Sequence, residues 1–412
     1  MSTHSVPITT IREILPHDNA NALEIAKVFD WEVVVQKGRY KPGDVVIYVP
    51  VDSVLPWDLE QKIFPPESKI KLRKSRIRSI KIRGKISQGL TLDLDEVGDL
   101  LWVSDKNPNE LVDTDVAELL GITKYEPPEH EIPNAMKVGK PKKAGNPNFK
   151  KYTDIENFKY YDRMFQDYEQ VYVSEKLHGT SFRAGWYPMV ANTLWKKVKR
   201  FFGKLPEWEF CWGSRTIQIQ VKGHHGGVNI PSQGVQFDDV YTKMVKQYNL
   251  KERIPVGYAV YGEIVGDGIQ KGYTYGCGPK EHKLFVYDVM DTKTGLYLDY
   301  FNEAVMCQGL TMVSGESQAF TLNAPPAEPQ FFPLLVAQMG LERVPELYHG
   351  PFEREVIDRL RDGDSLVGGQ KIREGIVIKP AVEKTCSIGR KVLKYISDAY
   401  YLKNQEDGTD FH

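Results

Sequence analysis

Six short runs of β-branched and aromatic residues follow one another between residues 170 and 397, and each of them carries a charged side chain. They are "QVYVSEK", "FCWGSR", "GYAVYGEIVG", "KLFVYDVM", "EGIVIKP" and "KVLKYIS". Runs of this length and composition are typical of β-strands. The C-terminal part of the chain is therefore predicted to be built on sheets, and its candidate chemistry lies on these strands.

The N-terminal part, residues 1–125, is also predicted to be rich in strands. "WEVVVQ" and "DVVIYVPVDSVL" are β-branched runs, and the turn-forming "KGRYKPGD" separates them. A third run, "KIKLRKSRIRSIKIRGKISQGLTLDL", partly alternates apolar and basic residues. Short strands joined by Gly and Pro turns predict a small barrel, and a basic outer face suits an oligonucleotide-binding (OB) fold.

The basic segment of this region, residues 69–85, contains nine Lys or Arg and no acidic residue. Strand alternation predicts that Lys81 and Arg83 share one face. Nine uncompensated charges repel one another unless an anionic partner is present, so we predict nucleic-acid contact by Lys81, Arg83 and Lys85. A solvated strand face is the alternative. Because the formal net charge of the chain is −1, affinity for nucleic acid has to come from such local patches.

Composition also suggests how the chain is divided. Residues 126–150 are rich in Pro, Gly, Asn and Lys without periodicity, which predicts a linker, and residues 151–412 form the second expected domain. Within residues 194–202, five apolar residues at helical spacing are interleaved with four basic ones. This pattern predicts an amphipathic helix lying on the domain, with RNA contact through its basic face as the alternative. A second helical region is predicted over residues 327–362, with Gly363 as its stop.

The overall composition limits the class of protein. Hydrophobic residues make up 41% of the chain and charged residues 26%, as in folded soluble proteins. Four cysteines without CxxC spacing predict reduced, structural cysteines in an intracellular protein. The N-terminal "MSTHSVPITT" lacks an apolar signal core, and no apolar run approaches the roughly 18 residues of a membrane span. We expect a cytoplasmic or nuclear protein that is not secreted and has no membrane partner.

Lys176, at the end of the first of the six runs, is the candidate nucleophile. A lysine is protonated at neutral pH and attacks phosphorus only after losing its proton, which nearby cations favour. Lys379 and Lys394, on the last two runs, are the candidate cations. Glu263 and Glu374 are candidates for holding a divalent metal or a ribose.

Other residues on or near these runs suit a nucleotide. Arg215 follows a Gly-Ser turn, and its planar guanidinium can bind a phosphate. Tyr287 can stack on a base, and Phe285 lies two residues earlier on the same strand face. The glycine-rich "GDGIQKGYTYGCG" has no GK[ST] and opens no Rossmann unit, so we predict a loop near the active site.

Taken in order, these motifs are similar to those of the covalent nucleotidyltransferase superfamily of polynucleotide ligases and mRNA capping enzymes. "EKLHG", "WGSR", "YGEIVG", "KLFVYDV", "EGIVIKP" and "VLKYIS" follow the superfamily's order. His178 stands where DNA ligases and capping enzymes usually have aspartate, and "KLHG" resembles an RNA ligase. Together with "GRYKPGDVVIYVPVDSVLP" and "IKIRGKISQGL", the chain resembles a two-domain ATP-dependent RNA ligase family with an N-terminal OB domain.

This resemblance implies roles for individual residues. It implies that Lys176 is the nucleophile that takes AMP and that His178 is needed after adenylylation. Around the nucleotide, it implies Glu175 near the adenosine, Tyr287 against the adenine with Phe285 beside it, and Lys379 and Lys394 on the ATP phosphates. It also implies Glu263 on the ribose or metal-bound water, Glu374 on the metal, and Arg215 on the RNA end or a phosphate. The last motif departs from the family because Ile396 stands where many ligases have a second basic residue. Lys391, Arg390 or Lys403 is the candidate substitute.

The implied fold is α+β: an N-terminal OB-like barrel, then a nucleotidyltransferase domain of mostly antiparallel sheets with flanking helices. The implied function is ATP-dependent sealing of 3′-OH/5′-phosphate RNA ends through a lysyl-AMP intermediate and an adenylylated 5′-phosphate. ATP, Mg²⁺ or Mn²⁺, and a nicked RNA duplex or RNA/DNA hybrid are the expected partners of a monomer. The alternatives are a DNA ligase, a GTP-using mRNA capping guanylyltransferase, and a non-catalytic RNA-binding protein. A nucleotide-labelling panel separates these alternatives.

Overall fold

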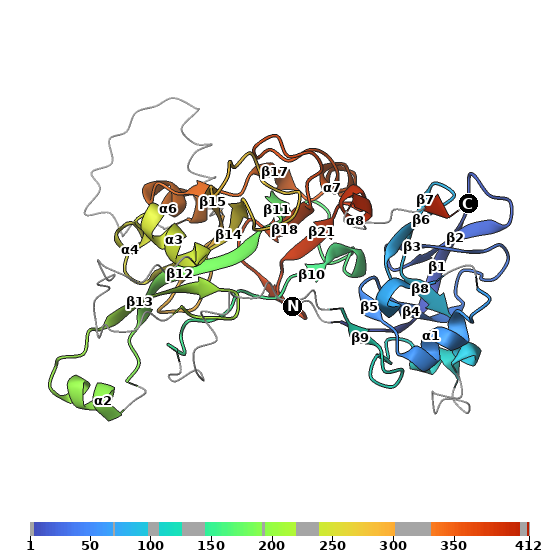
Figure 1. Ribbon diagram of the computed structural model, residues 1–412, viewed down its shortest axis with the longest axis horizontal. Helices are drawn as coiled ribbons and strands as arrows, with labels where there is room; N and C mark the ends of the chain where they lie inside the picture. Colours follow the sequence, from blue (N-terminus) through green and yellow to red (C-terminus); the bar gives the residue numbers. More distant parts are fainter. Residues whose placement is uncertain are drawn as a thin grey trace, which may run out of the picture. The chain divides into compact units, whose positions relative to one another are not determined.

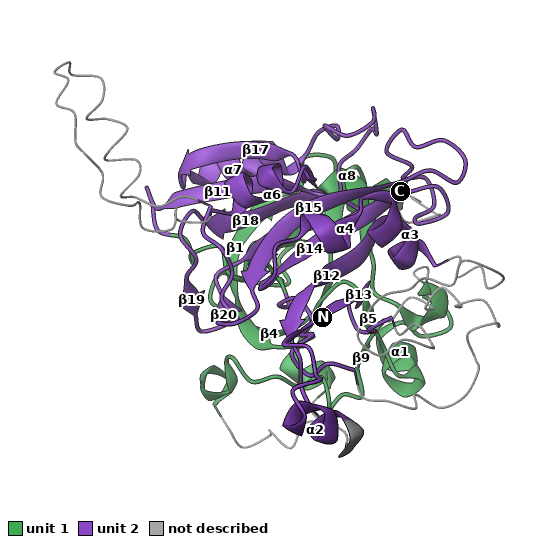
Figure 2. Cartoon of the chain, turned by 90° about the vertical axis from the view of Figure 1, so that its left-hand side faces the viewer, with its two compact units in different colours: residues 1–138, 155–165, 395–412 green, residues 139–154, 166–394 purple. Residues whose placement is uncertain are grey.

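The computed structural model describes residues 4–68, 71–97, 107–125, 145–191, 194–219, 239–300, 331–403 and 410–411. The chain divides into two compact units (Figures 1 and 2). Unit 1 comprises Met1–Val138, Ile155–Phe165 and Tyr395–His412, and unit 2 comprises Gly139–Asp154 and Gln166–Lys394. Most of the predicted linker, residues 126–144, lies outside the described residues, and so does Cys307.

Unit 1 consists mainly of short strands. Its strands are β1 (Ile8–Pro16), β2 (Leu23–Val28), β3 (Trp31–Gln36), β4 (Val45–Val49), β5 (Ser53–Val54), β6 (Ser79–Ile82), β7 (Lys85–Gln88), β8 (Leu90–Leu92), β9 (Thr123–Lys124), β10 (Glu156–Asn157) and β22 (Asp410–Phe411). Its helices are α1 (Trp57–Ile63), α8 (Asp398–Lys403) and the 3₁₀ turns η1 (Arg73–Ser75), η2 (Leu94–Glu96), η3 (Pro108–Leu111) and η5 (Phe158–Tyr160).

Five of these strands form a sheet in the order β3-β2-β1-β4-β8, and β6 and β7 form a hairpin that joins β22. β1 lies between β2 and β4 and pairs with both. Its register with β2 shifts between Ile11 and Glu13, which indicates a β-bulge. Two apolar clusters fill the interior, one around Ile47 and Leu59 and one around Trp31. The predicted OB-like barrel is confirmed as a nearly closed antiparallel barrel.

The β6–β7 hairpin corrects one detail of the sequence prediction. Lys81 is exposed on β6, as expected, but Arg83 does not continue the strand. Arg83 and Gly84 have φ of 47° and 86°, so they form a two-residue turn of the kind that right-handed strand twist favours. The strand alternation predicted for Lys81 and Arg83 therefore ends at this Arg-Gly turn.

Residues 155–165, distant in sequence from the barrel strands, pack with the barrel residues inside unit 1. The ring of Tyr160 lies 5.4 Å from those of Phe29 and Trp31. Lys159 is buried, with its Nζ 2.5 Å from Gln88 Oε1. No pattern in the sequence predicted that residues 155–165 belong to this unit.

Unit 2 contains the six predicted runs. Its strands are β11 (Gln170–Lys176), β12 (Thr180–Pro188), β13 (Trp208–Ser214), β14 (Tyr258–Gly266), β15 (His282–Asp291), β16 (Glu342–Arg343), β17 (Glu346–Pro351), β18 (Gly375–Pro380), β19 (Thr385–Cys386), β20 (Gly389–Arg390) and β21 (Leu393–Ile396, which runs on into unit 1). Its helices are α2 (Leu194–Phe201), α3 (Val240–Gln247), α4 (Leu250–Arg253), α6 (Phe332–Gln338) and α7 (Arg354–Arg361).

Two sheets carry the candidate chemistry of unit 2. One has the order β13-β12-β14-β15-β16, and in the other β17, β11, β18 and β21 lie in that order. One face of the first sheet packs on α3 and α6 through a core that includes Phe182, Val260, Val286, Met244 and Leu335. The other face is therefore available to polar side chains. The expected α+β class with mostly antiparallel sheets is confirmed.

The helical region predicted over residues 327–362 is wrong in its middle. α6 and α7 form at its two ends, but β16 and β17 lie between them, and β17 pairs with β11 along five residues. Tertiary pairing with a buried strand outweighed the local helical pattern.

Across the described residues, no helix is long and apolar enough to cross a membrane. Cys211 and Cys277 are buried free thiols.

Candidate active site

Lys176 is the last residue of β11, and its neighbour in the ladder is Gly375, the first residue of β18. Glu374, which precedes β18, is thereby brought beside it. Lys176 Nζ lies 2.5 Å from Glu374 Oε1, and the two side chains are 26% and 10% exposed. The nucleophile candidate is thus a partly shielded amine held by a carboxylate. Lys379, one of the candidate cations, pairs instead with Asp288.

A second carboxylate, Glu263 on β14, faces the same place. Its Oε1 accepts a hydrogen bond of 3.1 Å from the backbone N–H of Gly179. Burial raises the pKa of Glu263 to about 8, Lys176 acts against that rise, and Glu374 adds to it. Gly179 itself is required here because a Cβ at this position would lie 2.2 Å from the carbonyl oxygen of Ile264. The glycine three residues after the lysine lets the chain approach β14.

His178 is held by the glycine-rich loop that follows β14. Its backbone N–H donates to Tyr275 Oη at 2.7 Å, and its ring lies 5.0 Å edge-on from that of Tyr273. Nδ1 of His178 is 3.8 Å from Glu374 Oε2, which is too long for a hydrogen bond. In the same loop, Gln270 donates to the carbonyl of Gly179 at 2.9 Å. The glycine-rich loop thus contacts the residues that follow Lys176.

Glu175 lies on the opposite face of β11 from Lys176, since successive residues of a strand alternate. Its Oε2 accepts from the backbone N–H of Leu366 at 2.9 Å, whereas its buried Oε1 has no hydrogen-bond partner. Burial raises the pKa of this carboxyl group. The structure therefore does not place Glu175 on the face that carries Lys176.

The aromatic candidates lie on β15, opposite Glu263. Phe285 pairs with Glu263 in the ladder, and directly opposed residues share a face of the sheet. The register then shifts, because Tyr261 pairs with Asp288 while the next residue, Gly262, pairs with Val286. Tyr287 is the extra residue of this bulge, and its Oη lies 3.2 Å from Ser181 Oγ on β12.

The bulge also brings Asp288 to the polar face, where it binds Lys379 of the fifth run and Arg390, which precedes the sixth run. Asp288 Oδ2 lies 2.8 Å from Lys379 Nζ and 2.9 Å from Arg390 Nη2, and it accepts from Tyr152 Oη at 2.7 Å. Arg390 also pairs with Glu383. Burial alone acts to raise the pKa of Asp288, but Lys379 and Arg390 hold it below its ordinary value. Lys379 is therefore neutralised, with only 5% of its side chain exposed.

The remaining candidates are placed as follows. Lys394 is half-buried on β21. Arg215 follows β13 and pairs with Asp154. In unit 1, Lys85 pairs with Asp18, while Lys81 and Arg83 are exposed. Among the alternatives for the second basic residue of the last motif, Arg390 joins the Asp288 cluster, and Lys391 instead binds Glu169.

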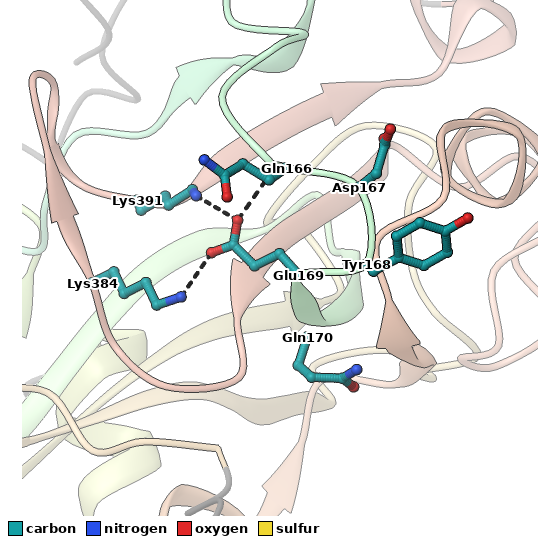
Figure 3. A pocket seen from close by; sticks show the side chains of 7 residues that line it. All are labelled: Gln166, Asp167, Tyr168, Glu169, Gln170, Lys384 and Lys391. Carbon is teal, nitrogen blue, oxygen red and sulfur yellow. Dashed lines mark hydrogen bonds and ion pairs between the residues drawn. The ribbon is translucent and has the colours of Figure 1, made fainter.

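A pocket of about 500 Å³ opens at the far end of β11 from Lys176 (Figure 3). Its two lysines, Lys384 and Lys391, converge on Glu169 at 3.1 and 2.6 Å, while Tyr168 points away from them. β11 is seven residues long, and at ~3.3 Å per residue it separates this pocket from the amine by roughly 20 Å. The pocket is therefore not the place where Lys176 acts.

The donor set around Lys176 suits a cation by its chemistry. Oε2 of Glu374 is buried and has no hydrogen-bond partner, and Glu263 is the nearby second carboxylate. Within the described ranges, no group of three or more His, Cys, Asp or Glu side chains has metal-binding geometry. Two carboxylates fit Mg²⁺ or Mn²⁺, which keep much of their water and bind substrate phosphates.

Sequence reasoning missed several residues that build this site. The sequence patterns do not single out Asp288, Ser181 or Tyr275, although Asp288 lies in "FVYDV" and Tyr275 in "GYTYG". The aspartate carried a signal, because a charge within an otherwise apolar strand requires partners. The tyrosine of the loop had none, since its role depends on tertiary contact alone.

Comparison with known proteins identifies the family. The RNA ligase family model matches residues 169–396, which is more than half of the chain. The chain belongs to the RNA ligase family. An OB-fold domain model matches residues 5–94, so this ligase has the expected order of OB domain and ligase domain. The search of curated proteins found no significant match.

Solved structures of RNA ligase from Naegleria gruberi share this fold over nearly the whole length. A mutant with ATP and Mn has a TM-score of 0.66 at 23% identity, covering 98% of this chain and 100% of that one. The ligase with PPi has a TM-score of 0.64 at 24% identity, covering 98% and 99%. A mutant with AMP and Mn has a TM-score of 0.64 at 22% identity, with the same coverage. RNA is the substrate class of the family.

Proposed function

We propose that this RNA ligase uses ATP to seal 3′-OH/5′-phosphate RNA ends through an AMP bound covalently to Lys176. The observation that carries the proposal is the juxtaposition of Lys176 with Glu374 and Glu263 at the ends of paired strands. ATP, AMP and Mn accompany the structurally similar Naegleria gruberi ligase, which supports ATP and a divalent metal here.

The reaction requires three in-line displacements at phosphorus. The Lys176 amine attacks the α-phosphate of ATP and displaces pyrophosphate, forming a P–N bond. The AMP then passes to the 5′-phosphate of an RNA strand, restoring the lysine. A 3′-OH finally attacks that phosphate, forming the new P–O bond and releasing AMP. Such steps depend mainly on positioning and charge neutralisation.

The protein's own residues position the amine and receive its proton. Glu374 Oε1 accepts a hydrogen bond from Lys176 Nζ at 2.5 Å, so it orients the amine and is placed to take a proton from it. Glu263 and Glu374 would hold the divalent metal, which would neutralise charge on the phosphates. Tyr287, with Phe285 beside it, offers an aromatic surface for the adenine, and Lys379 and Lys394 would contact phosphates. Nicked RNA duplex or RNA/DNA hybrid is the proposed substrate form.

The deciding experiment labels the protein with ATP that carries ³²P at the α-phosphate. We expect Lys176→Ala to lose covalent labelling completely, while the control Lys246→Ala, an exposed lysine on α3, labels like the wild type. A Lys176→Ala protein that still becomes labelled contradicts the assignment. Labelling by GTP instead points to a capping enzyme, and sealing of nicked DNA alone points to a DNA ligase. A wild-type protein that forms no nucleotide adduct is an RNA-binding protein.

A further inference from the structure

The β12–β13 hairpin carries a short helix that the ligase chemistry does not use. The strands pair from Phe182 with Ser214 to Pro188 with Trp208, and α2 lies in the loop beyond them. Both views show α2 standing apart from the two sheets of unit 2 (Figures 1 and 2). β12 has nine residues, and at ~3.3 Å each it spans about 30 Å. β12 pairs with β14 only as far as Gly185, so the end of the hairpin extends past that pairing, and we call the β12–β13 hairpin a stalk with the helix at its tip.

The apolar side chains that the structure describes at the C-terminal end of this helix are exposed. Val198, Phe201 and Phe202 are 38%, 86% and 65% exposed. The two phenylalanine rings contact each other edge-on, with their centroids 5.4 Å apart. The prediction of an amphipathic helix lying on the domain is therefore wrong. The helix is amphipathic, but the stalk holds it away from the surface that would bury its apolar side.

The basic side of α2 is turned partly toward the stalk. Lys196 Nζ lies 3.9 Å from Glu209 Oε2 on β13, and Lys199 is half-buried. Lys197, Arg200 and Lys204 are exposed beside the phenylalanines. A helix that binds RNA through phosphates presents its basic side outward. Here the side that faces outward is apolar and has a basic rim, so the observations disfavour RNA as the partner.

The chemistry of the tip defines what covers it. Residues 189–206 contain five Lys or Arg and no acidic residue. Glu207 and Glu209 follow, and Glu209 pairs with Lys196, so the tip keeps a net positive charge that favours an anionic partner. The partner must also take up two phenylalanines and a valine. An anionic phospholipid surface does both, because aromatic and aliphatic side chains enter the boundary between headgroups and acyl chains while Lys and Arg remain among the headgroups.

We propose that α2 and Phe202–Lys204 dock this RNA ligase peripherally on an anionic membrane. This binding lies in the interface and does not span the bilayer, and it departs from the sequence expectation of no membrane partner. The stalk keeps the lipid surface roughly 30 Å from the start of β12, where Gly179 and Ser181 border the active site. Membrane docking therefore leaves the ligase chemistry unobstructed.

The test sediments the full-length protein with vesicles. One set contains equal parts of phosphatidylcholine and phosphatidylglycerol, and the other contains phosphatidylcholine alone. We expect binding to the anionic set only, lost at high salt. Phe201→Ser/Phe202→Ser is expected to weaken binding at least about tenfold, since two exposed aromatic rings no longer enter the interface. Removing the charge in Lys197→Ser is expected to weaken it about fivefold.

The matched control is Leu296→Ser, which removes an exposed leucine (69% exposed) from another turn of unit 2. It is expected to bind vesicles like the wild type, and all variants are expected to unfold at the wild-type urea concentration. Wild-type protein that stays in the supernatant with anionic vesicles overturns the proposal. Vesicle binding that survives Phe201→Ser/Phe202→Ser also overturns it. The proposal fails as well if the wild type does not bind vesicles and this variant loses RNA affinity, or if the wild type is a dimer and this variant is a monomer. None of these readouts depends on adenylylation, so the proposed ATP chemistry stands or fails separately.

Discussion

Glu263 provides a quantitative test of the site's electrostatics, through the replacement Glu263→Gln. Burial raises the pKa of this carboxyl group to about 8, against an ordinary value of 4.5. Between those two values the unfolded chain has already lost the proton that the folded chain retains, so stability falls as pH rises from about 4.5 to about 8. At ~1.4 kcal/mol per pH unit, the full loss is about 5 kcal/mol. Glu263 remains partly exposed, and solvent reduces the figure to about 2–3 kcal/mol.

Glutamine has the shape of the protonated glutamate and does not titrate. Glu263→Gln is therefore expected to match the wild type at about pH 5 and to exceed its free energy of unfolding by about 2–3 kcal/mol at about pH 9. Urea denaturation followed by tryptophan fluorescence measures both, with the slope checked for constancy. The variant is also expected to lose metal-dependent adenylylation, because a neutral amide replaces a proposed metal ligand. Function and stability thus move in opposite directions.

The control is Glu169→Gln, which carries the opposite sign. Burial acts to raise the pKa of Glu169, but its hydrogen bonds with Lys391 and Lys384 hold that pKa below the ordinary value. Its stabilising effect is complete above the unfolded pKa and is lost as pH falls through the folded one. Glu169→Gln is expected to be less stable than the wild type at both about pH 7 and about pH 9. Equal unfolding midpoints for Glu263→Gln and wild type at about pH 9 would refute the reasoning.

Two further predictions concern the other charged clusters. Asp288→Asn leaves Lys379 and Arg390 facing each other without their shared anion, so we expect a loss of about 3–5 kcal/mol in the free energy of unfolding. In urea titrations, the double variant Asp288→Asn/Lys379→Met should recover part of this loss. Additive effects of the two substitutions would show that the pair is not coupled. In the OB domain, Lys81→Ser/Arg83→Ser is expected to lower the salt dependence of nicked-RNA binding by about two phosphate contacts without changing adenylylation. Lys85→Ser should change the salt dependence less, because the Lys85 ammonium already pairs with Asp18. An unchanged salt slope in the double variant would show that this face does not contact the RNA.

The strands of the ligase domain could be predicted because their apolar runs are short and strongly β-branched. Lys176, Glu374 and Glu263 could be paired in advance only through the resemblance, since their contact depends on which strands become neighbours. β17 was misread because residues 346–351 form a strand only by pairing with β11. Deleting residues 1–125 would remove the partners of Tyr160 and Lys159 within unit 1. Point variants therefore test the OB domain more cleanly.

The bulge in β15 determines how the charged residues of the candidate site are paired. Strict alternation would place Tyr287 and Asp288 on opposite faces, and Asp288 would then not reach the cleft. The extra residue instead turns both toward it, so one carboxylate neutralises Lys379 and Arg390. Lys176 is likewise paired, with Glu374. At the proposed ATP site, a triphosphate would therefore have to replace these carboxylates as the partner of the cations, and a divalent metal bound by Glu374 and Glu263 would reverse the sign of the field around the amine.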